Sequence, residues 1–363
     1  MDKYFVASIA AAKDVGNKRI RHLLEIFGNG QTIWSADVAD LKQAGLPKNA
    51  FESLVTWRQN HPDVPEQLAD YCQRNGFGLC SFADEDYPPI LKEISVPPII
   101  FYYRGKLLPH VERIGIVGTR ENTVYGKDIA LALGSDLAAA GFTVVSGAAK
   151  GIDSFAHRGA LKTGRTVAVL GQGLATRCPR EKKKLLDQIV DSGGLIMSEF
   201  SLKTEPNEGT FITRNRIIAG LCRGVVVVEA GEKSGALNTG SWAIDNNRDV
   251  FVIPGSIYWE KSAGCNKLIY EGAKLIRNAR DILSEYNIDV SAVSKETSPT
   301  VELSAVESKI LALIPQGDFI TDDEILDAVD DVAPHELPQI MIELEIKGCI
   351  VEDAGRYTRK FGG

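Results

Sequence analysis

The chain has 363 residues, of which 44% are hydrophobic and 25% charged, and its formal net charge is −7. This length suits two or three globular domains, and no uncharged apolar run reaches the length of about 18 residues that a membrane span needs. The six cysteines and five histidines are scattered without a CxxC pair, so we expect a cytoplasmic protein without disulfides, metal or cofactor.

Residues 1–65 are predicted to form a helical domain. Apolar residues recur at helical spacing around Gly16 and Gly28, and charged residues soon follow the first apolar patch, which favours a helix over a signal peptide. Short helices joined by glycine turns resemble the helix-hairpin-helix (SAM-like) style of small DNA-associated domains. A plain helical adaptor is the alternative.

Residues 66–285 are predicted to form one larger domain, which begins with a bridging segment. Residues 76–82 have a strand-like composition, and the segment 87–105, rich in proline and aromatic residues, indicates a turn, a short helix and an edge strand. We expect this segment to extend the sheet that follows.

From residue 111 onward, apolar strands alternate with helical segments. The predicted strands cover residues 113–118, 143–147, 166–171, 194–199, 224–230 and 249–255. Continuous apolar strands separated by helices indicate an α/β fold with a doubly wound, extended Rossmann-like parallel sheet.

The C-terminal part is predicted to be a separate module. Residues 286–302 are rich in Ser, Thr and Pro and indicate a linker, and residues 303–363 show three helical patterns and a β-wing, as in a winged-helix-like domain. Residues 287–363 contain 16 acidic and six basic residues, whereas the remainder contains 32 and 35. The third helix carries Glu336, Glu343 and Glu345 against Lys347, so we expect it to contact protein, or the basic body, instead of DNA.

Two glycine-rich turns carry the strongest functional signal. Residues 115–126 and 144–153 each break from a strand into a turn that holds a cation, Arg120 in the first and Lys150 in the second. In a parallel sheet such turns open at the same carboxyl edge, where backbone amides and helix N-termini can meet an anion. Arg120 can bind a phosphate bidentately.

The second turn also suggests a catalytic alternative. Asp153 is expected to be the N-cap of a helix beginning at Ser154, and His157 lies four residues further, on the same face. An acid–base pair, with Glu199 as a third member, is conceivable, but structural roles are favoured for both residues.

Three further segments place polar groups at the same edge. One is the basic run 177–184, one is the helix start 211–221, and one is the turn with Ser234, Gly235 and Thr239. In the helix start, Arg214 and Arg216 are expected on different faces, one exposed toward the site and the other bracing neighbouring loops.

A row of cationic turns suits the successive phosphates of a single nucleic-acid strand. A dinucleotide site is disfavoured because no GxGxxG occurs and the second strand ends in Ser146 where an acidic residue would bind a ribose. The predicted strand-binding residues are Gly118, Thr119, Arg120, Ser146, Gly147, Lys150, Gly151, Arg180, Lys182, Lys183, Arg214, Asn215 and Arg216, with no catalytic residue and no metal ligand.

Across residues 111–278 the chain resembles the DNA-processing protein A family, also called DprA or Smf. The matching motifs include GIVGTRENTVYG, VVSGAAKGIDSFAHRGAL, FITRNRIIAGL and VVVVEAGEKSGALNTGSWA. The resemblance implies a non-enzymatic protein of natural transformation that protects incoming single-stranded DNA and loads RecA recombinase onto it, as a homodimer and away from membranes. It also implies that Arg120 is the DNA-binding arginine of the family's G-[ST]-R turn.

The chain departs from the family at one motif. Cys178, Pro179 and Lys182 stand where the family has Tyr-Pro followed by Asn, so the local contact with DNA is expected to differ. A nucleotide phosphoribohydrolase or a nucleotide-sensing domain is the alternative function.

Overall fold

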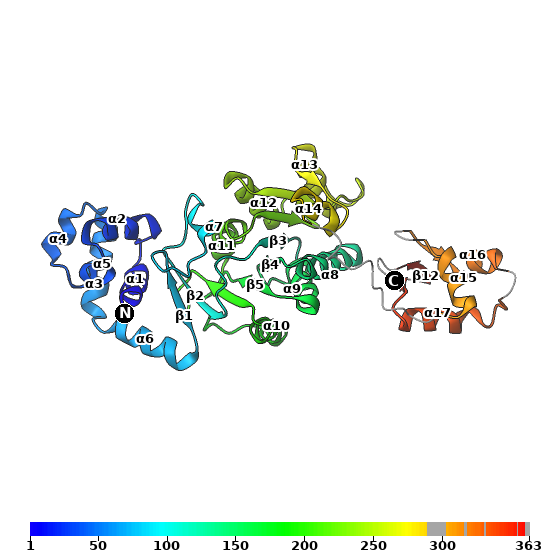
Figure 1. The fold of residues 1–363 in the computed structure, drawn as a ribbon, viewed down its shortest axis with the longest axis horizontal. Coiled ribbons are helices and arrows are strands. Elements are labelled where there is room, and N and C mark those ends of the chain that lie inside the picture. The colour runs from blue at the N-terminus through cyan, green and yellow to red at the C-terminus, as the bar shows by residue number, and fades with distance from the viewer. Residues whose placement is uncertain (289–302, 316–317, 330–331, 354, 360–363) are drawn as a thin grey trace.

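The computed structural model describes residues 1–288, 303–315, 318–329, 332–353 and 355–359 (Figure 1). From residue 289 onward, the predicted linker lies outside the described residues. Among the described residues, no helix combines the length and the apolar composition needed to cross a bilayer.

Helices make up the N-terminal part, as predicted. They are α1 (Asp2–Ala10), α2 (Asn17–Phe27), α3 (Gly30–Ser35), α4 (Val38–Gln43), α5 (Lys48–Asn60) and α6 (Val64–Asn75). The helical part is longer than predicted, because α6 crosses the expected boundary at residue 65 and continues to Asn75, with Pro65 in its first turn, where proline is tolerated. The core of these helices also includes Leu79 and Tyr102, so they pack against the start of the sheet.

A nine-stranded sheet forms the centre of the molecule. Its strands are β1 (Gly78–Ser81), β2 (Ile100–Gly105), β3 (Arg113–Val117), β4 (Thr143–Ser146), β5 (Thr166–Val169), β6 (Leu195–Ser198), β7 (Gly224–Val227), β8 (Asp249–Val252) and β9 (Lys274–Leu275). The order is β1-β2-β6-β5-β4-β3-β7-β8-β9. All pairs from β6 to β9 are parallel, which confirms the predicted fold class.

The bridging segment extends this sheet, with one difference from the prediction. β2 pairs antiparallel with both β1 and β6, so β1 forms the edge and β2 does not. The prolines that suggested an edge strand precede β2, and two of them lie at the start of the short helix α7 (Pro89–Lys92). They therefore remove no backbone N–H donor from the hydrogen bonds of the sheet.

Helices cover both faces of the sheet (Figure 1). They are α8 (Val124–Ala139), α9 (Ile152–Thr163), α10 (Arg180–Asp191), α11 (Glu208–Gly220), α12 (Gly235–Asp245), α13 (Glu260–Tyr270) and α14 (Ala279–Glu285). Alternate strand residues point to opposite faces: Ile114 and Ile116 join the core under α8 and α9, whereas Val117 joins the core under α11 and α12.

The strand order creates a switch point between β3 and β7. The chain runs outward from β3 to β6 and then returns to place β7 on the other side of β3. The loops after β3 and β7 therefore diverge at the carboxyl edge and leave a crevice, the usual ligand position in open α/β sheets.

The C-terminal module consists of α15 (Ala305–Leu313), β10 (Ile320–Thr321), α16 (Asp322–Ala328), α17 (Leu337–Ile346), β11 (Ile350–Asp353) and β12 (Arg356–Arg359). The short sheet has the order β10-β12-β11, and Ile310, Leu337 and Leu344 lie in the core beneath it. The three helices and the final hairpin follow one another as predicted, whereas β10, between the first two helices, was not predicted. Its assignment to the winged-helix class stays a prediction.

Candidate functional site

A cavity of about 840 Å³ lies at the switch point, and we call it the rim cavity. Its walls come from the loop after β3, from the start of α11 and from the start of α12, with Ala149 and Asp153 on the side of β4. The predicted residues Gly118, Thr119, Arg120, Arg214 and Asn215 all line it. The structure thus brings five of the predicted residues together.

Arg120 is exposed at this cavity and lies over an aromatic ring. Its guanidinium carbon is 4.8 Å from the centroid of the Phe211 ring. A capping box positions Phe211 near the start of α11: Asn207 accepts from the Thr210 amide, and the Thr210 hydroxyl accepts from the Asn207 amide. A guanidinium stacked in this way keeps its N–H edge open to a phosphate.

The turn with Lys150 packs directly against the turn with Arg120. Gly151 has φ +88°, and a Cβ there would lie 2.4 Å from the Thr119 carbonyl oxygen and 2.8 Å from the Arg120 Cα. The Ile152 amide donates to the Thr119 carbonyl over 3.2 Å. Only glycine allows this approach, and it sets the exposed Lys150 next to Arg120.

The other two predicted glycines also serve packing. A Cβ on Gly118 would lie 2.6 Å from the Ile152 side chain, and one on Gly147 would lie 2.3 Å from the Arg214 guanidinium. A glycine in such a turn can let the backbone approach a bound phosphate. Instead, the space that a Cβ would take is filled by protein atoms.

Asp153 does not form the predicted N-cap. The helix α9 begins at Ile152 with Gly151 as its N-cap, and the Asp153 carboxylate accepts from the Gly147 and Ala149 amides over 3.2 and 3.4 Å. Asp153 is the second residue of α9, two positions past the N-cap. Its carboxylate instead closes the turn after β4, and burial raises its pKa.

Arg214 is buried beneath the same turn, with 3% of its surface exposed. Its guanidinium donates to the Gly147 carbonyl over 2.8 Å and to the Val169 carbonyl, which joins the ends of β4 and β5. Burial lowers its pKa to about 10, although the Asp153 carboxylate acts in the opposite direction. Arg214 therefore places positive charge in the wall of the rim cavity.

Arg216 is also buried, so the expectation that one of the two arginines is exposed is wrong. Only 4% of its surface is exposed, and it donates to the Glu199 carboxylate over 2.5 Å. Both faces of α11 are covered at this level, because the residues from Arg214 to Gly220 are all buried. A guanidinium at either position must then find its partners inside the protein.

The conceivable catalytic set is not assembled. His157 is fully buried, and its Nδ1 lies 2.6 Å from the hydroxyl of Thr166, which itself donates to the Val144 carbonyl. Nδ1 therefore carries the proton, and burial lowers the pKa of the ring to about 3. Glu199 binds Arg216, and neither Glu199 nor Asp153 is hydrogen-bonded to His157.

Two predicted residues near the turns act on protein groups. Ser146 is fully buried and donates to the Ile116 carbonyl over 2.6 Å, which ties β4 to β3. Asn215 donates to the Gly235 carbonyl over 3.3 Å and to Asn238 over 3.4 Å. It thereby braces α11 against the first turn of α12, whose N-cap is Ser234.

The basic run divides between two places. Lys182 is half-buried, donates to Gln172 over 3.1 Å, and has its pKa lowered by burial and then by the nearby charge of Arg214. Arg120 lowers it further, so Lys182 belongs to the same electrostatic cluster. Arg180 and Lys183 are exposed on the first turn of α10, where Lys183 pairs with Asp187 over 2.7 Å.

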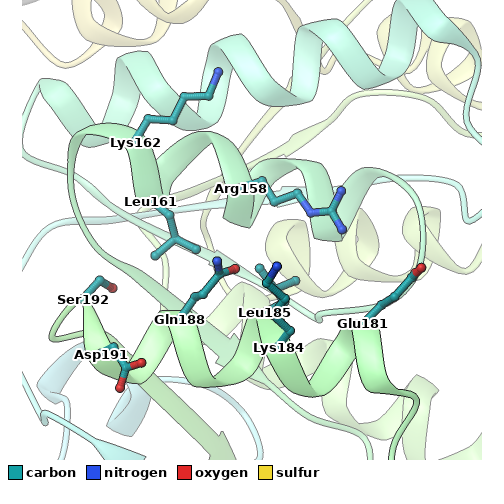
Figure 2. A pocket seen from close by; sticks show the side chains of 9 residues that line it. All are labelled: Arg158, Leu161, Lys162, Glu181, Lys184, Leu185, Gln188, Asp191 and Ser192. Carbon is teal, nitrogen blue, oxygen red and sulfur yellow. The ribbon is translucent and has the colours of Figure 1, made fainter.

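A second hollow, of about 660 Å³, lies between α9 and α10 (Figure 2). It contains the cations Arg158, Lys162 and Lys184, but Glu181 and Asp191 line it as well. The rim cavity is also mixed in charge, since Glu121, Asp153 and Glu208 line it, but it lies at the switch point, where open α/β sheets usually bind their ligands.

Sequence reasoning missed Phe211 and Lys233, which both line the rim cavity. Phe211 lies three residues before Arg214 on the same helix, a spacing that places the two on one face and could have identified it. Lys233 stands directly before the turn with Ser234 and Gly235. A Cβ on Gly235 would meet no atom within 4 Å, so this glycine leaves the start of α12 open.

The chain is similar to one family of known proteins over most of its length. Residues 78–287 match the model of a family described as DNA recombination-mediator protein A. The chain is 33% identical to Protein Smf of Synechocystis over 96% of each chain, and 38% identical to the DNA processing protein DprA of Streptococcus pneumoniae over 74% of this chain and 93% of that one.

Two solved structures are also similar. The X-ray structure of DprA from S. pneumoniae has a TM-score of 0.66 and 34% identity, covering 78% of this chain and 98% of that one. A structure of DNA processing protein A from Helicobacter pylori, described for its single-stranded DNA binding mode, has a TM-score of 0.52 and 29% identity, covering 58% of this chain and 95% of that one.

Proposed function

Because the chain belongs to the DNA recombination-mediator protein A family, we propose that it binds single-stranded DNA along the rim cavity. Arg120 carries this proposal. It is the exposed guanidinium at the switch-point cavity, it lies over the Phe211 ring, and no ion pair occupies it among the described residues. A phosphate can therefore reach it without displacing a protein carboxylate.

The cations around Arg120 extend the binding surface. Lys150 adjoins the Arg120 backbone through Gly151, and Lys182 shares the electrostatic field of Arg120 and Arg214. Such a group can neutralise successive phosphates of a flexible strand. The buried residues Ser146, Arg214 and Arg216 hold the turns in position, and direct contact is proposed for the exposed ones, including Arg180 and Lys183.

We further propose the role that the family resemblance implied. The bound strand is incoming DNA of natural transformation, the protein protects it and loads RecA recombinase onto it, and the working form is a homodimer. The H. pylori protein described for its single-stranded DNA binding mode supports the DNA-binding part of this proposal. RecA loading and dimer formation rest on the family relationship alone.

The proposal is tested by reversing the charge of Arg120. Arg120→Glu should weaken the binding of labelled oligo-dT by about tenfold or more, and the slope of log affinity against log salt should fall by about one. The matched control is Arg165→Glu, since Arg165 is an exposed arginine at the amino end of β5, on the opposite edge of the sheet. Fluorescence anisotropy at several salt concentrations measures both quantities.

Equal losses in the two variants would contradict the assigned site, because a general change in net charge would then explain them. The competing nucleotide phosphoribohydrolase predicts free base when the wild-type protein is incubated with nucleoside monophosphates. Chromatography of the reaction mixture detects that base directly.

A further inference from the structure

The loop between β8 and α13 exposes an unusual run of apolar side chains. Ile257 is 82% exposed, Tyr258 is 89% exposed and Trp259 is 45% exposed. Neighbouring large apolar residues on a surface commonly mark a site of contact. None of the three side chains belongs to a buried core cluster among the described residues, so their exposure calls for a reason outside the fold.

The loop is held in a defined conformation. The Ser256 carbonyl accepts from the Trp259 amide over 3.1 Å, and its hydroxyl accepts from the Tyr258 amide over 3.3 Å. The Trp259 ring packs edge-on against Tyr125, with 6.2 Å between ring centroids, and the Tyr125 hydroxyl donates to the Pro254 carbonyl over 3.0 Å. The aromatic rings are therefore presented by a fixed turn.

This turn adjoins the loop of Arg120. β8 is parallel to β7 and two strands from β3, so the loop after it opens at the same carboxyl edge. Lys261, in the first turn of α13, donates from Nζ to the carbonyl of Glu121, the residue directly after Arg120. The exposed rings thus lie two or three residues before a side chain that contacts the loop of Arg120.

We propose that Tyr258 and Trp259 stack on unpaired bases of the strand whose phosphates Arg120 and Lys150 bind. This inference rests on the proposed function and adds a base-recognition surface to it. Unpaired bases offer free π-faces, which aromatic side chains bind with little sequence preference. In a duplex those faces are covered by neighbouring base pairs, so the rings also select single strands over duplex DNA.

The test compares a strand with bases and a strand without them. Full-length wild-type protein should bind oligo-dT about tenfold more tightly than an abasic oligonucleotide of equal length, because each base stacked on a ring adds to the binding free energy. Tyr258→Leu should lower the oligo-dT affinity by about fivefold or more and leave both the abasic affinity and the salt slope unchanged. Tyr258→Phe, which keeps the ring, should behave like the wild type.

Tyr270→Leu is the matched control. Tyr270 is 92% exposed at the other end of α13, so its substitution should leave the ratio of the two affinities unchanged. Arg120→Glu should weaken both oligonucleotides together. A loss of phosphate binding is thus distinguished from a loss of stacking.

The proposal is overturned if Tyr258→Leu leaves the ratio of oligo-dT affinity to abasic affinity unchanged. It is also overturned if Tyr258→Phe does not keep the wild-type ratio. It is also overturned if Tyr258→Leu alters sedimentation without altering the ratio, because the rings would then face a second copy of the chain. If the wild type binds neither oligonucleotide, the proposed function and this inference fail together.

Discussion

At the scale of the residue, burial separates side chains of identical chemistry. Arg120 is exposed over Phe211, whereas Arg214 has 3% of its surface exposed and donates to the Gly147 and Val169 carbonyls. The first guanidinium can exchange water for phosphate, whereas the second is buried and donates from one nitrogen to two backbone carbonyls. Mutation of Arg214 would therefore disturb the turns, so Arg120 is the residue that isolates a binding role.

His157 provides a prediction on pH at this scale. Burial lowers its pKa to about 3 in the folded protein, below the value of 6.5 expected for the unfolded chain. Below about pH 6.5 the His157 ring is therefore protonated in the unfolded chain but stays neutral in the folded protein. The free energy of unfolding consequently decreases as the pH is lowered through this range. Through this residue, lowering the pH from 7 to 5 should reduce the free energy of unfolding by about 2 kcal/mol.

The control is His157→Asn, whose amide keeps a donor near Thr166 and does not titrate. Urea unfolding of both proteins at pH 7, 6 and 5 gives the difference in pH dependence, from which the constant cost of the substitution cancels. Parallel curves for the two proteins would contradict the buried neutral histidine.

At the scale of the element, α11 performs several tasks with successive residues. Phe211 faces Arg120, Arg214 holds two strand ends, Asn215 braces α12 and Arg216 binds Glu199. A helix with such a varied ring of polar partners has little amphipathic pattern. Its capping box at Asn207 sets the register in which all these side chains point.

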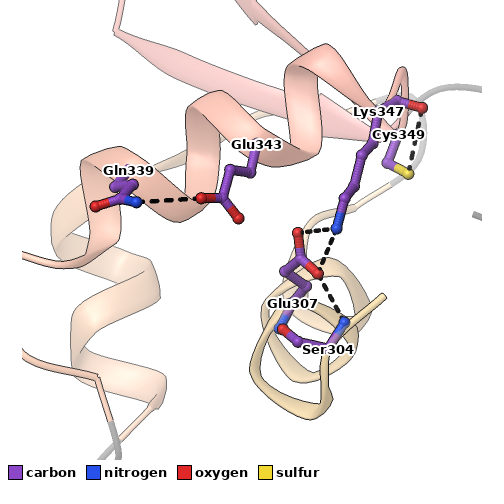
Figure 3. A network of polar contacts seen from close by, with 6 residues as sticks. All are labelled: Ser304, Glu307, Gln339, Glu343, Lys347 and Cys349. Carbon is purple, nitrogen blue, oxygen red and sulfur yellow. Dashed lines mark hydrogen bonds and ion pairs between the residues drawn. The ribbon is translucent and has the colours of Figure 1, made fainter. Parts of the chain in front are cut away.

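The C-terminal module has an element-scale contact that is open to test (Figure 3). Glu307 on α15 is 3% exposed, and both its carboxylate oxygens accept from Lys347 at the end of α17, over 2.6 and 2.7 Å. Lys347, and next the Ser304 amide, lower the pKa of Glu307. Lys347→Met should destabilise the module by about 1–3 kcal/mol, because a covered carboxylate loses its partner.

Hydrogen exchange of the α15 and α17 amides in the full-length protein measures this loss. Gln339→Ala is the control, since Gln339 donates to Glu343 over 3.2 Å on the exposed face of α17. Gln339→Ala should change the stability of the module by no more than about 0.5 kcal/mol. Equal exchange in both variants would show that the Glu307–Lys347 contact adds no stability.

At the scale of the whole molecule, charge is divided unequally. Residues 1–286 have 32 acids and 35 bases, whereas residues 287–363 have 16 acids and six bases. A polyanion should therefore meet attraction at the body and repulsion at the C-terminal module. The module's acidic residues also include Glu343 and Glu345 of α17, the helix that a winged-helix domain would use on DNA.

A chain ending at residue 288 tests this division. It should bind oligo-dT as tightly as the full-length protein or up to about threefold more tightly, with the gain larger in 50 mM than in 200 mM salt, because salt screens the repulsion. Fluorescence anisotropy measures the affinities. An affinity about tenfold weaker than that of the full-length protein would instead show that the module contacts DNA.

Local patterns in the sequence predicted the elements but not their ends. Apolar strands and helical spacing identified β3 to β8 and the helices between them, because buried parallel strands require continuous apolar runs. The patterns placed β2 at the edge and ended the helical part ten residues early. Pairing partners and packing against β1 decided those points, and neither is local.

By itself, the sequence determined the class of fold, and it indicated the edge of the sheet at which we propose the site, with the cation Arg120 in its glycine turn. These follow from spacing and composition, which local physics converts into strands and turns. Only the tertiary structure decided which polar groups face solvent. It turned Ser146, Arg214 and Arg216 inward, brought Phe211 under Arg120 and left Tyr258 exposed. Exposure depends on contacts between segments far apart in the chain, and no window of sequence contains them.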